Sequence, residues 1–193
     1  MKNIVLASNS PRRKDILSRY KIPFKVVPSN IEEKILDNKK PHEKVMSLAF
    51  QKAVDVAEKV EDGSIILAAD TIVFLDGEIL GKPQSQQEAI DTLSKMSNRN
   101  HSVFTGISIV KSGTNVKVLD YCETKVKFRK LDSNMINRYI ATGEYKDKAG
   151  SYGIQDIGAI LVEEIVGSYS NVVGLPIVKV DNMLRIYFNL NLI

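Results

Sequence analysis

The middle of the chain holds two long strand-like runs in succession, and this feature limits the fold more than any other. The runs extend from about residue 102 to 110 and from about 116 to 128, and Ser112-Gly113-Thr114-Asn115 lies between them as a turn. Elsewhere helix-like and strand-like segments alternate, which is the pattern of a sheet covered by helices. The combination predicts the α/β class, with a mixed sheet and helices packed on its faces.

The other elements follow from the spacing of apolar residues and from turn residues. Short or β-branched apolar runs predict strands at residues 4–7, 24–27, 64–75, 78–80 and 159–165. Helical spacing and capping residues predict helices at residues 11–20, 41–60, 86–96, 133–143 and 176–188. We find no repeat, low-complexity tract or linker, so residues 1–193 are expected to form a single domain.

The composition argues against several classes of protein. A net charge of +4 over 193 residues is mild, whereas a dedicated nucleic-acid domain usually carries more charge on one face. Cys122 is the single cysteine, so no internal disulfide can form and a reducing compartment is expected. The apolar run at residues 4–7 is too short for a signal peptide, and no stretch approaches the ~18 apolar residues of a membrane span. We therefore expect a cytoplasmic protein without a membrane or nucleic-acid partner.

A polar loop between the first strand and the first helix carries the strongest local signal for an anionic ligand. The segment reads Leu6-Ala-Ser-Asn-Ser-Pro-Arg-Arg13, in which Ser10 and Pro11 suit the cap and the first position of a helix. Free amides at a helix N-terminus bind anions, and arginine offers two donors to a phosphate. Without an anion, Arg12 and Arg13 would oppose the helix dipole. The segment predicts a phosphate site, the alternative being a helix start whose arginines face water.

Asp70 interrupts an apolar run, residues 67–74, that is predicted to be a strand. A carboxylate there is costly to bury unless it is paired or binds a cation. Strand aspartates are common Mg²⁺ ligands and general bases in phosphate chemistry. Glu33, in the loop after the second strand, could complete a site with two carboxylates. The alternative is that Asp70 hydrogen-bonds to a neighbouring loop and that Glu33 faces solvent.

Other polar residues give weaker signals. Lys52 lies at the edge of the apolar stripe of the long helix, and Lys82 follows a predicted hairpin, but lysines in such places usually reach solvent. Gln155 ends a glycine-containing segment, and its amide carries the donor and acceptor that could recognise a base edge. His101 at the start of a strand is more often structural than an acid or base. Cys122 has the pattern of a half-buried strand residue rather than of a nucleophile.

Seven stretches in this order resemble the Maf family of nucleotide pyrophosphatases, which is named for septum formation. They are Leu6–Arg13, Ile31–Glu33, Ala69–Thr71, Gly81–Pro83, His101–Gly106, Asp147–Gln155 and Gly167–Pro176. Each stretch alone is a weak signal, but seven in order cover almost the whole chain. The resemblance implies an elongated α/β fold with a mixed sheet, flanking helices and a central cleft, similar to the inosine triphosphate pyrophosphatases. Members of the family are often dimers, so the resemblance also implies a possible homodimer.

The resemblance implies roles for particular residues of this chain. The family's aspartate that matches Asp70 is proposed as the proton acceptor, and the residues that match Arg12, Thr71 and Gln155 are linked to substrate choice. The polyphosphate cleft of the family is lined by the residues that match Ser8, Arg13, Glu33, Lys52 and Lys82. We expect Glu33 and Asp70 to hold Mg²⁺ or Mn²⁺, because Mg²⁺ typically takes one or two carboxylates together with substrate phosphates.

Two branches of the family differ at three of these places. The branch that acts on 7-methyl-GTP has a bulky Trp after the Ser-Pro, Gln after the strand aspartate, and Ser-Glu-Gly in place of the loop that ends in Gln155. This chain has Arg12, Thr71 and Tyr152-Gly-Ile-Gln155, like the dTTP/UTP branch. The expected function is hydrolysis of dTTP, UTP or related pyrimidine nucleotides to the monophosphate and pyrophosphate. The alternatives are a 7-methyl-GTP pyrophosphatase, a non-enzymatic nucleotide-binding regulator of cell division, and a nucleic-acid-binding protein.

Overall fold

The computed structural model describes residues 3–34 and 38–193. Its framework is a seven-stranded sheet with the strand order β2-β1-β3-β5-β6-β7, in which β4 also pairs with β3. The strands are β1 (Ile4–Leu6), β2 (Phe24–Val26), β3 (Ile65–Leu75), β4 (Glu78–Leu80), β5 (Asn100–Lys111), β6 (Lys117–Phe128) and β7 (Val162–Val166). The pairings of β1 with β2 and β3 are parallel, and those of β3 with β4 and β5, and of β6 with β5 and β7, are antiparallel. The sheet is therefore mixed, as the two consecutive long strands predict.

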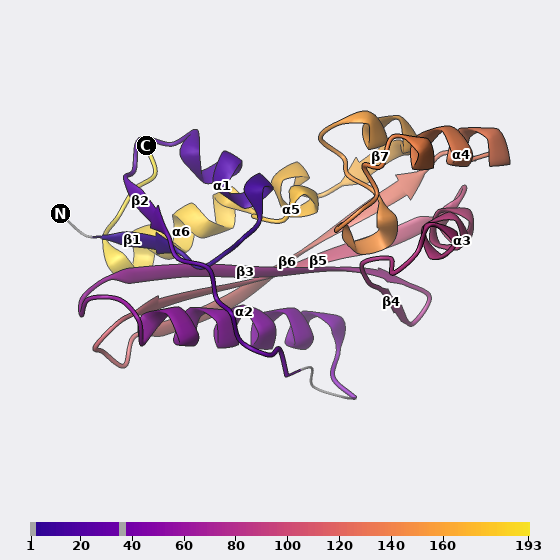
Figure 1. Cartoon of the computed structure of the whole chain (residues 1–193). Coiled ribbons are helices and arrows are strands. Elements are labelled where there is room, and N and C mark those ends of the chain that lie inside the picture. The colour runs from indigo at the N-terminus through magenta and orange to yellow at the C-terminus, as the bar shows by residue number, and fades with distance from the viewer. Residues whose placement is uncertain (1–2, 35–37) are drawn as a thin grey trace.

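Three long strands give the molecule its elongated shape (Figure 1). Strands β3, β5 and β6 have 11 or 12 residues each and lie side by side. Helix α2 (Pro41–Ala57) lies along one face of the sheet. On the other face, α1 (Pro11–Ser18), α5 (Tyr169–Val173) and α6 (Ile177–Phe188) gather towards one end, and α3 (Gln86–Met96) and α4 (Ser133–Ala141) towards the other.

The core has two parts, one on each face of the sheet, because successive strand residues point to opposite faces. In β3, Ile65, Leu67 and Ala69 belong to the larger part, which also contains α3, α4 and α6 residues. Ile66 and Ala68 belong to the smaller part, which packs against Ala53 and Val56 of α2. The fully apolar start of β3 is explained by this burial on both faces.

The close approach of α2 to the sheet depends on Gly106 of β5. A Cβ built at Gly106 would lie 2.3 Å from the backbone carbonyl carbon and oxygen of Val45 in α2. Any side chain at this position would therefore push the helix away from the sheet. This contact matters for function, because α2 carries Lys52 and Gly106 is the register partner of Asp70 in β3.

Several boundaries differ from those expected from the sequence. Helix α2 ends at Ala57 instead of residue 60, and α1 ends at Ser18 instead of residue 20. The predicted strand 159–165 begins later, at Val162, because Ile157–Leu161 form a 3₁₀ helix, η2. Helix α5 was not expected, because five residues are too few to show a helical period. None of the described helices is both long and apolar enough to cross a membrane.

Candidate active site

A large cleft of about 1130 Å³ is lined by residues from the β1–α1 loop, α1, α2, β3 and the segment 146–155. The structure places all the site residues expected from the sequence along this cleft, although they come from distant parts of the chain. They are Ser8, Arg12, Arg13, Glu33, Lys52, Asp70, Thr71, Lys82 and Gln155. The structure thus shows that these side chains share one hollow, and their individual roles stay predictions.

Lys52 and two carboxylates form the most highly charged part of the cleft. The Nζ atom of Lys52 lies 2.6 Å from Oδ1 of Asp70 and 2.8 Å from Oε1 of Glu33. The side chains of Lys52 and Asp70 are 17% and 13% exposed, so water screens this pair only weakly. Asp70 follows the buried start of β3, and Lys52 points from α2 towards the same place. The costly carboxylate in the strand is therefore paired, as burial requires.

Arg13 is fixed by three hydrogen bonds before any ligand binds. Its Nε donates to the carbonyl of Gly174 at 2.7 Å, its Nη2 to Oγ1 of Thr71 at 2.9 Å, and its Nη1 to Oγ of Ser8 at 3.4 Å. Burial lowers the pKa of Arg13, and the charge of Asp70 opposes this shift. A guanidinium held in this way loses little further side-chain entropy when it binds an anion.

Thr71 connects Arg13 to a buried polar chain. Besides accepting from Arg13, the Thr71 hydroxyl lies 2.9 Å from that of Thr105 in β5, which donates to the carbonyl of Asn171 at 3.1 Å. Asn171 is fully buried, and its amide donates to the carbonyl of Val103 at 2.9 Å. Thr71 therefore positions Arg13 in this structure.

The start of α1 differs in one detail from the sequence prediction. Ser10 occupies the N-cap position, but its side chain makes no capping hydrogen bond. Instead, its amide donates to Oγ of Ser8 at 3.1 Å. The first turn of α1 contains no acidic residue, so no carboxylate of this turn offsets the positive end of the helix and the two arginines, which line the cleft.

The segment that carries Gln155 is tied to the loop that carries Lys82. The amide of Gly150 donates to the carbonyl of Gly81 at 3.0 Å. Lys148, which the sequence reading passed over as part of a family stretch, also lines the cleft. Burial lowers the pKa of Lys148, and the nearby charge of Arg12 lowers it further. In the sequence, the position of Lys148 between Asp147 and Gly150 is the feature that could have indicated a ligand contact. Only the fold shows that Lys148 reaches the cleft.

Gln51 is a second residue that sequence reasoning missed. Its Oε1 accepts from the amide of Lys34 at 3.0 Å, and its Nε2 donates to the carbonyl of Lys34 at 2.9 Å. The side chain thus clamps the backbone next to Glu33 to α2. Nothing in the sequence distinguishes Gln51 from other solvent-facing helix residues.

His101 and Cys122 have the structural character that the sequence favours. His101 is 3% exposed, its Nε2 lies 2.8 Å from the hydroxyl of Tyr152, and its ring packs edge-on against Phe128 and Tyr152. Burial lowers the pKa of His101 to about 4, so the ring is neutral at physiological pH. Burial raises the pKa of the half-buried Cys122 thiol, which is the opposite of nucleophile activation.

The pair of Glu33 and Asp70 fits a divalent cation of the Mg²⁺ type. Residues 3–34 and 38–193 contain no group of three or more acidic, His or Cys side chains that could hold a metal by themselves. Mg²⁺ does not require such a group, because it usually keeps several waters and takes one or two carboxylates together with phosphate oxygens. Two carboxylate oxygens already converge on one positive charge, that of Lys52, so the place suits a cation.

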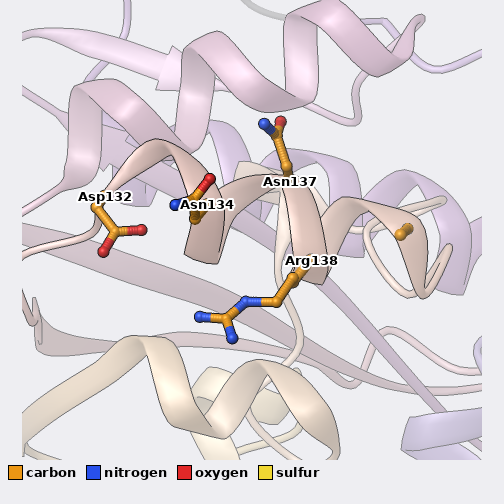
Figure 2. Close-up of a pocket in the computed structure, with 5 residues that line it drawn as sticks. Asp132, Asn134, Asn137 and Arg138 are labelled. Carbon is orange, nitrogen blue, oxygen red and sulfur yellow. The ribbon is translucent and has the colours of Figure 1, made fainter.

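A second hollow, of about 500 Å³, lies on the exposed side of α4 (Figure 2). It is lined by Asp132, Asn134, Asn137, Arg138 and Ala141. Asn137 and Arg138 point to different sides of the helix, and Oδ1 of Asp132 accepts from the amide of Met135 as a helix cap. These side chains do not converge on a common point, so the chemistry belongs to the larger cleft.

Comparisons with known proteins place the chain in a family. A family model described as "Maf-like protein" matches residues 3–187. The protein named dTTP/UTP pyrophosphatase of Ruminiclostridium cellulolyticum is 49% identical, and the match covers 96% of each chain. The protein of the same name in Pyrococcus furiosus is 48% identical, with 96% of each chain covered.

Two solved structures are similar at low sequence identity. The HAM1 protein from Coxiella burnetii is 19% identical, with a TM-score of 0.46 over 66% of this chain and 73% of that chain. The Staphylococcus aureus Ham1 protein is 16% identical, with a TM-score of 0.44 over 66% of this chain and 72% of that chain.

Proposed function

The chain belongs to the Maf-like protein family, and on this premise we propose that it is a nucleoside triphosphate pyrophosphatase acting on dTTP and UTP. The observation that carries the proposal is the joint placement of Asp70, Glu33, Lys52 and Arg13 in one cleft. Relatives 46–49% identical over nearly the whole chain are named dTTP/UTP pyrophosphatases. The products are the nucleoside monophosphate and pyrophosphate.

The cleft provides positively charged side chains for the triphosphate. Arg13 presents a guanidinium whose orientation is already fixed, and the first turn of α1 adds its amides and the charge of Arg12. Lys52 and Lys82 bring ammonium groups from α2 and from the loop after β4. Positive charges that are held in place neutralise the charge that grows on the leaving pyrophosphate.

Asp70 is the proton acceptor in this proposal. Lys52 contacts Asp70 through Oδ1, so the carboxylate is held while it accepts a proton from the attacking water. The water oxygen forms the new bond to phosphorus, the anhydride bond breaks, and pyrophosphate leaves with the bonding electrons. Lys52 thus orients Asp70 through one contact and Glu33 through another.

We also propose that Glu33 and Asp70 hold Mg²⁺ or Mn²⁺ in the working enzyme. When bound, such an ion neutralises phosphate charge and orients the triphosphate. The support is the convergence of the two carboxylates in the cleft.

The choice of pyrimidine nucleotides is assigned to Gln155, with Arg12 and Thr71 as further contributors. All three line the cleft, and the neutral amide of Gln155 can pair with the donor and acceptor edge of uracil or thymine. The hydroxyl of Thr71 also holds Arg13 in position. A carboxylate at position 155 would instead favour the donor-rich edge of a cationic 7-methylguanine.

We propose that the protein works in the cytoplasm as a homodimer, without a nucleic-acid or membrane partner. Its single cysteine suits a reducing compartment, and its charge of +4 is modest. Sedimentation at several concentrations would test the dimer.

Pyrophosphate release from a panel of nucleotides is the experiment that tests the function. The panel contains dTTP, UTP, CTP, GTP and 7-methyl-GTP, each with Mg²⁺ or Mn²⁺. We expect selective turnover of dTTP and UTP, and a loss of about a thousandfold in kcat in Asp70→Asn. Selective turnover of 7-methyl-GTP would keep the reaction and overturn the assignment of Arg12, Thr71 and Gln155. No turnover of any nucleotide would support a binding protein instead.

A further inference from the structure

The segment from Gly153 to Gly158, which carries Gln155, forms a loop whose two ends meet. A Cβ built at Gly158 would lie 2.3 Å from the backbone oxygen of Gly153 and 3.1 Å from its nitrogen. The backbones at the two ends therefore touch, and no side chain fits at Gly158. Because the ends are so close, whatever fixes them also fixes the direction in which Gln155 points.

Two side chains from outside the loop hold these ends. The amide of Gly153 donates to the hydroxyl of Tyr139 at 3.3 Å, and the amide of Gly158 donates to both carboxylate oxygens of Glu144, each at 3.3 Å. Tyr139 lies on the buried face of α4, whereas Glu144 lies in the turn that follows this helix. Each end of the loop thus has its own acceptor.

The two acceptors also interact with each other. Burial raises the pKa of Tyr139, and the charge of Glu144 and its hydrogen bond to the tyrosine raise it further. Tyr139 therefore keeps its proton, so its hydroxyl can accept from Gly153 and donate to Glu144. The amide of Gly153 thus bonds to Tyr139 and the amide of Gly158 to Glu144, and these two groups lie close enough together for the charge of Glu144 to act on the tyrosine.

Glu144 lies behind the loop and is not among the residues that line the cleft. A Cβ built at Gly153 would lie 2.9 Å from Oε1 of Glu144 and 2.6 Å from Cε of Lys148. The backbone carbonyl of Glu144 accepts from Nζ of Lys148, which does line the cleft. The carboxylate of Glu144 therefore lies outside the lining of the cleft, but it contacts the backbone of the loop that carries Gln155.

We propose that Glu144 is a positioning residue for base selection, acting through Tyr139 and the amides of Gly153 and Gly158. It holds the loop in the one conformation in which Gln155 meets the base edge. The inference rests on the proposed function, because it takes Gln155 to be the residue that reads the base. Neither a general acid–base role nor contact with phosphate is required of Glu144.

A positioning role differs measurably from a merely structural one. Loss of general support would weaken every ligand of the cleft together, whereas loss of loop position would weaken only ligands that carry a base. Inorganic tripolyphosphate provides the comparison, because it has the phosphates of UTP and no base. The ratio of its inhibition constant to the KM of UTP therefore reports the position of the loop.

The test uses the full chain with Glu144→Ala, and Glu163→Ala as the matched control. Glu163 also loses a carboxylate, but it pairs with Lys127 on the surface of β7. We expect Glu144→Ala to raise the KM of UTP and dTTP roughly tenfold, the effect of losing hydrogen bonds to a charged group. The kcat, the inhibition constant of tripolyphosphate and the kinetics of Glu163→Ala should change less than about twofold.

Tyr139→Phe is the second variant, in case Glu144→Ala does not fold. It keeps the ring in the core and removes the hydroxyl that accepts from the amide of Gly153, so a smaller rise in the KM of UTP alone is expected. Equal weakening of UTP and tripolyphosphate, or no change of either, in the folded variants would overturn the inference. If the wild-type protein turns over no nucleotide, the proposed function fails separately. Equilibrium binding of UTP and tripolyphosphate to the same variants then still decides the role of Glu144.

Discussion

Two sets of residues in the cleft are held in place by different means. The charged set, Ser8, Arg13, Glu33, Lys52 and Asp70, consists of side chains that mostly contact one another directly. The loop set, residues 81–82 and 146–155, is held through its backbone, by the bond from Gly150 to Gly81 and by Tyr139 and Glu144. The charged set lies mainly on α1, α2 and β3, whereas the loop set lies on irregular segments.

The difference separates two kinds of recognition. Mutual contacts between opposite charges suit a triphosphate, which every nucleotide carries in the same form. Backbone contacts fix the shape of a loop, and shape together with one amide distinguishes one base from another. Mutations in the charged set should therefore affect all nucleotides alike, and mutations that move the loop set should change the choice among them.

After Asp70→Asn, the largest effect is expected from Lys52→Met. This variant keeps the stem that packs along α2 and leaves Asp70 and Glu33 without their shared ammonium. We expect kcat/KM to fall by a factor of about a hundred or more, because a partly buried carboxylate loses its partner. The fall should be similar for UTP, dTTP and GTP in parallel assays of pyrophosphate release. Lys59→Met, which removes an exposed lysine that lies just after α2 and pairs with Asp55 of that helix, is the control.

A selective loss of UTP turnover in Lys52→Met would break the distinction between the two sets. It would mean that Lys52 takes part in base recognition.

Part of the charged set could be predicted from the sequence because some residues conflict with their local surroundings, whereas Ser8, Glu33 and Lys52 were expected chiefly from the resemblance to the family. Asp70 interrupts an apolar strand, and Arg12 and Arg13 stand where the helix dipole disfavours positive charge. Such conflicts point to a partner or a ligand without knowledge of the fold. The mixed sheet could be predicted for a similar reason, since two long consecutive strand-like runs leave few alternatives.

The supports of the loop set could not be predicted in this way. In the sequence, Tyr139 and Glu144 look like ordinary helix and turn residues. They accept hydrogen bonds from backbone amides, and the sequence does not show which amides these are. His101 lies 51 positions before its partner Tyr152, so only the folded chain brings them together. The predicted strand at residues 159–165 includes the second half of the 3₁₀ helix η2, because a short apolar run does not separate the two structures.

The second effect is on the free energy of unfolding at low pH. It concerns His101, which lies 2.8 Å from the hydroxyl of Tyr152 in the loop set. The pKa of His101 is lowered by burial from 6.5 to about 4, so the unfolded chain binds the proton more readily than the folded one. The stability that the neutral ring provides is fully present above about pH 6.5. It is lost progressively as the pH falls towards 4, by roughly 3 kcal/mol in total.

Urea unfolding of the wild type and of His101→Asn between pH 7 and pH 4 measures this loss. The asparagine keeps a polar partner for Tyr152 but does not titrate. Asp55, whose pKa is lowered by its hydrogen bond to Lys59, contributes equally to both proteins and cancels in the difference. Equal pH dependence in the two proteins would show that His101 is not the group that titrates.

The third effect should reverse selectivity with little change in phosphate binding. Gln155→Glu replaces an amide that can donate to the base with a carboxylate that cannot. We expect kcat/KM for UTP to fall about tenfold, and the relative rate with 7-methyl-GTP to rise. The inhibition constant of tripolyphosphate should stay within about twofold.

Gln84→Glu is the control for Gln155→Glu, because Gln84 also lines the cleft and the variant adds the same charge. It should weaken UTP and tripolyphosphate together. If Gln155→Glu behaves in the same manner, Gln155 acts through charge alone and the loop set has no special part in selectivity.

The smallest effect concerns Glu33, a member of the charged set that is supported, like the loop set, through hydrogen bonds to the neighbouring backbone. Gln51 clamps the backbone of Lys34 with two hydrogen bonds, and this backbone leads directly from Glu33. Both bonds are exposed, so Gln51→Ala should raise the Mn²⁺ concentration for half-maximal activity only about threefold. Direct titration of Mn²⁺ binding by paramagnetic resonance should show the same shift, with the KM of UTP at saturating Mn²⁺ unchanged. Gln51→Glu keeps the acceptor for the Lys34 amide, so its Mn²⁺ concentration for half-maximal activity should lie between those of the wild type and Gln51→Ala. If Gln51→Ala binds Mn²⁺ as the wild type does, the contacts with Lys52 alone place Glu33, and the charged set needs no backbone clamp.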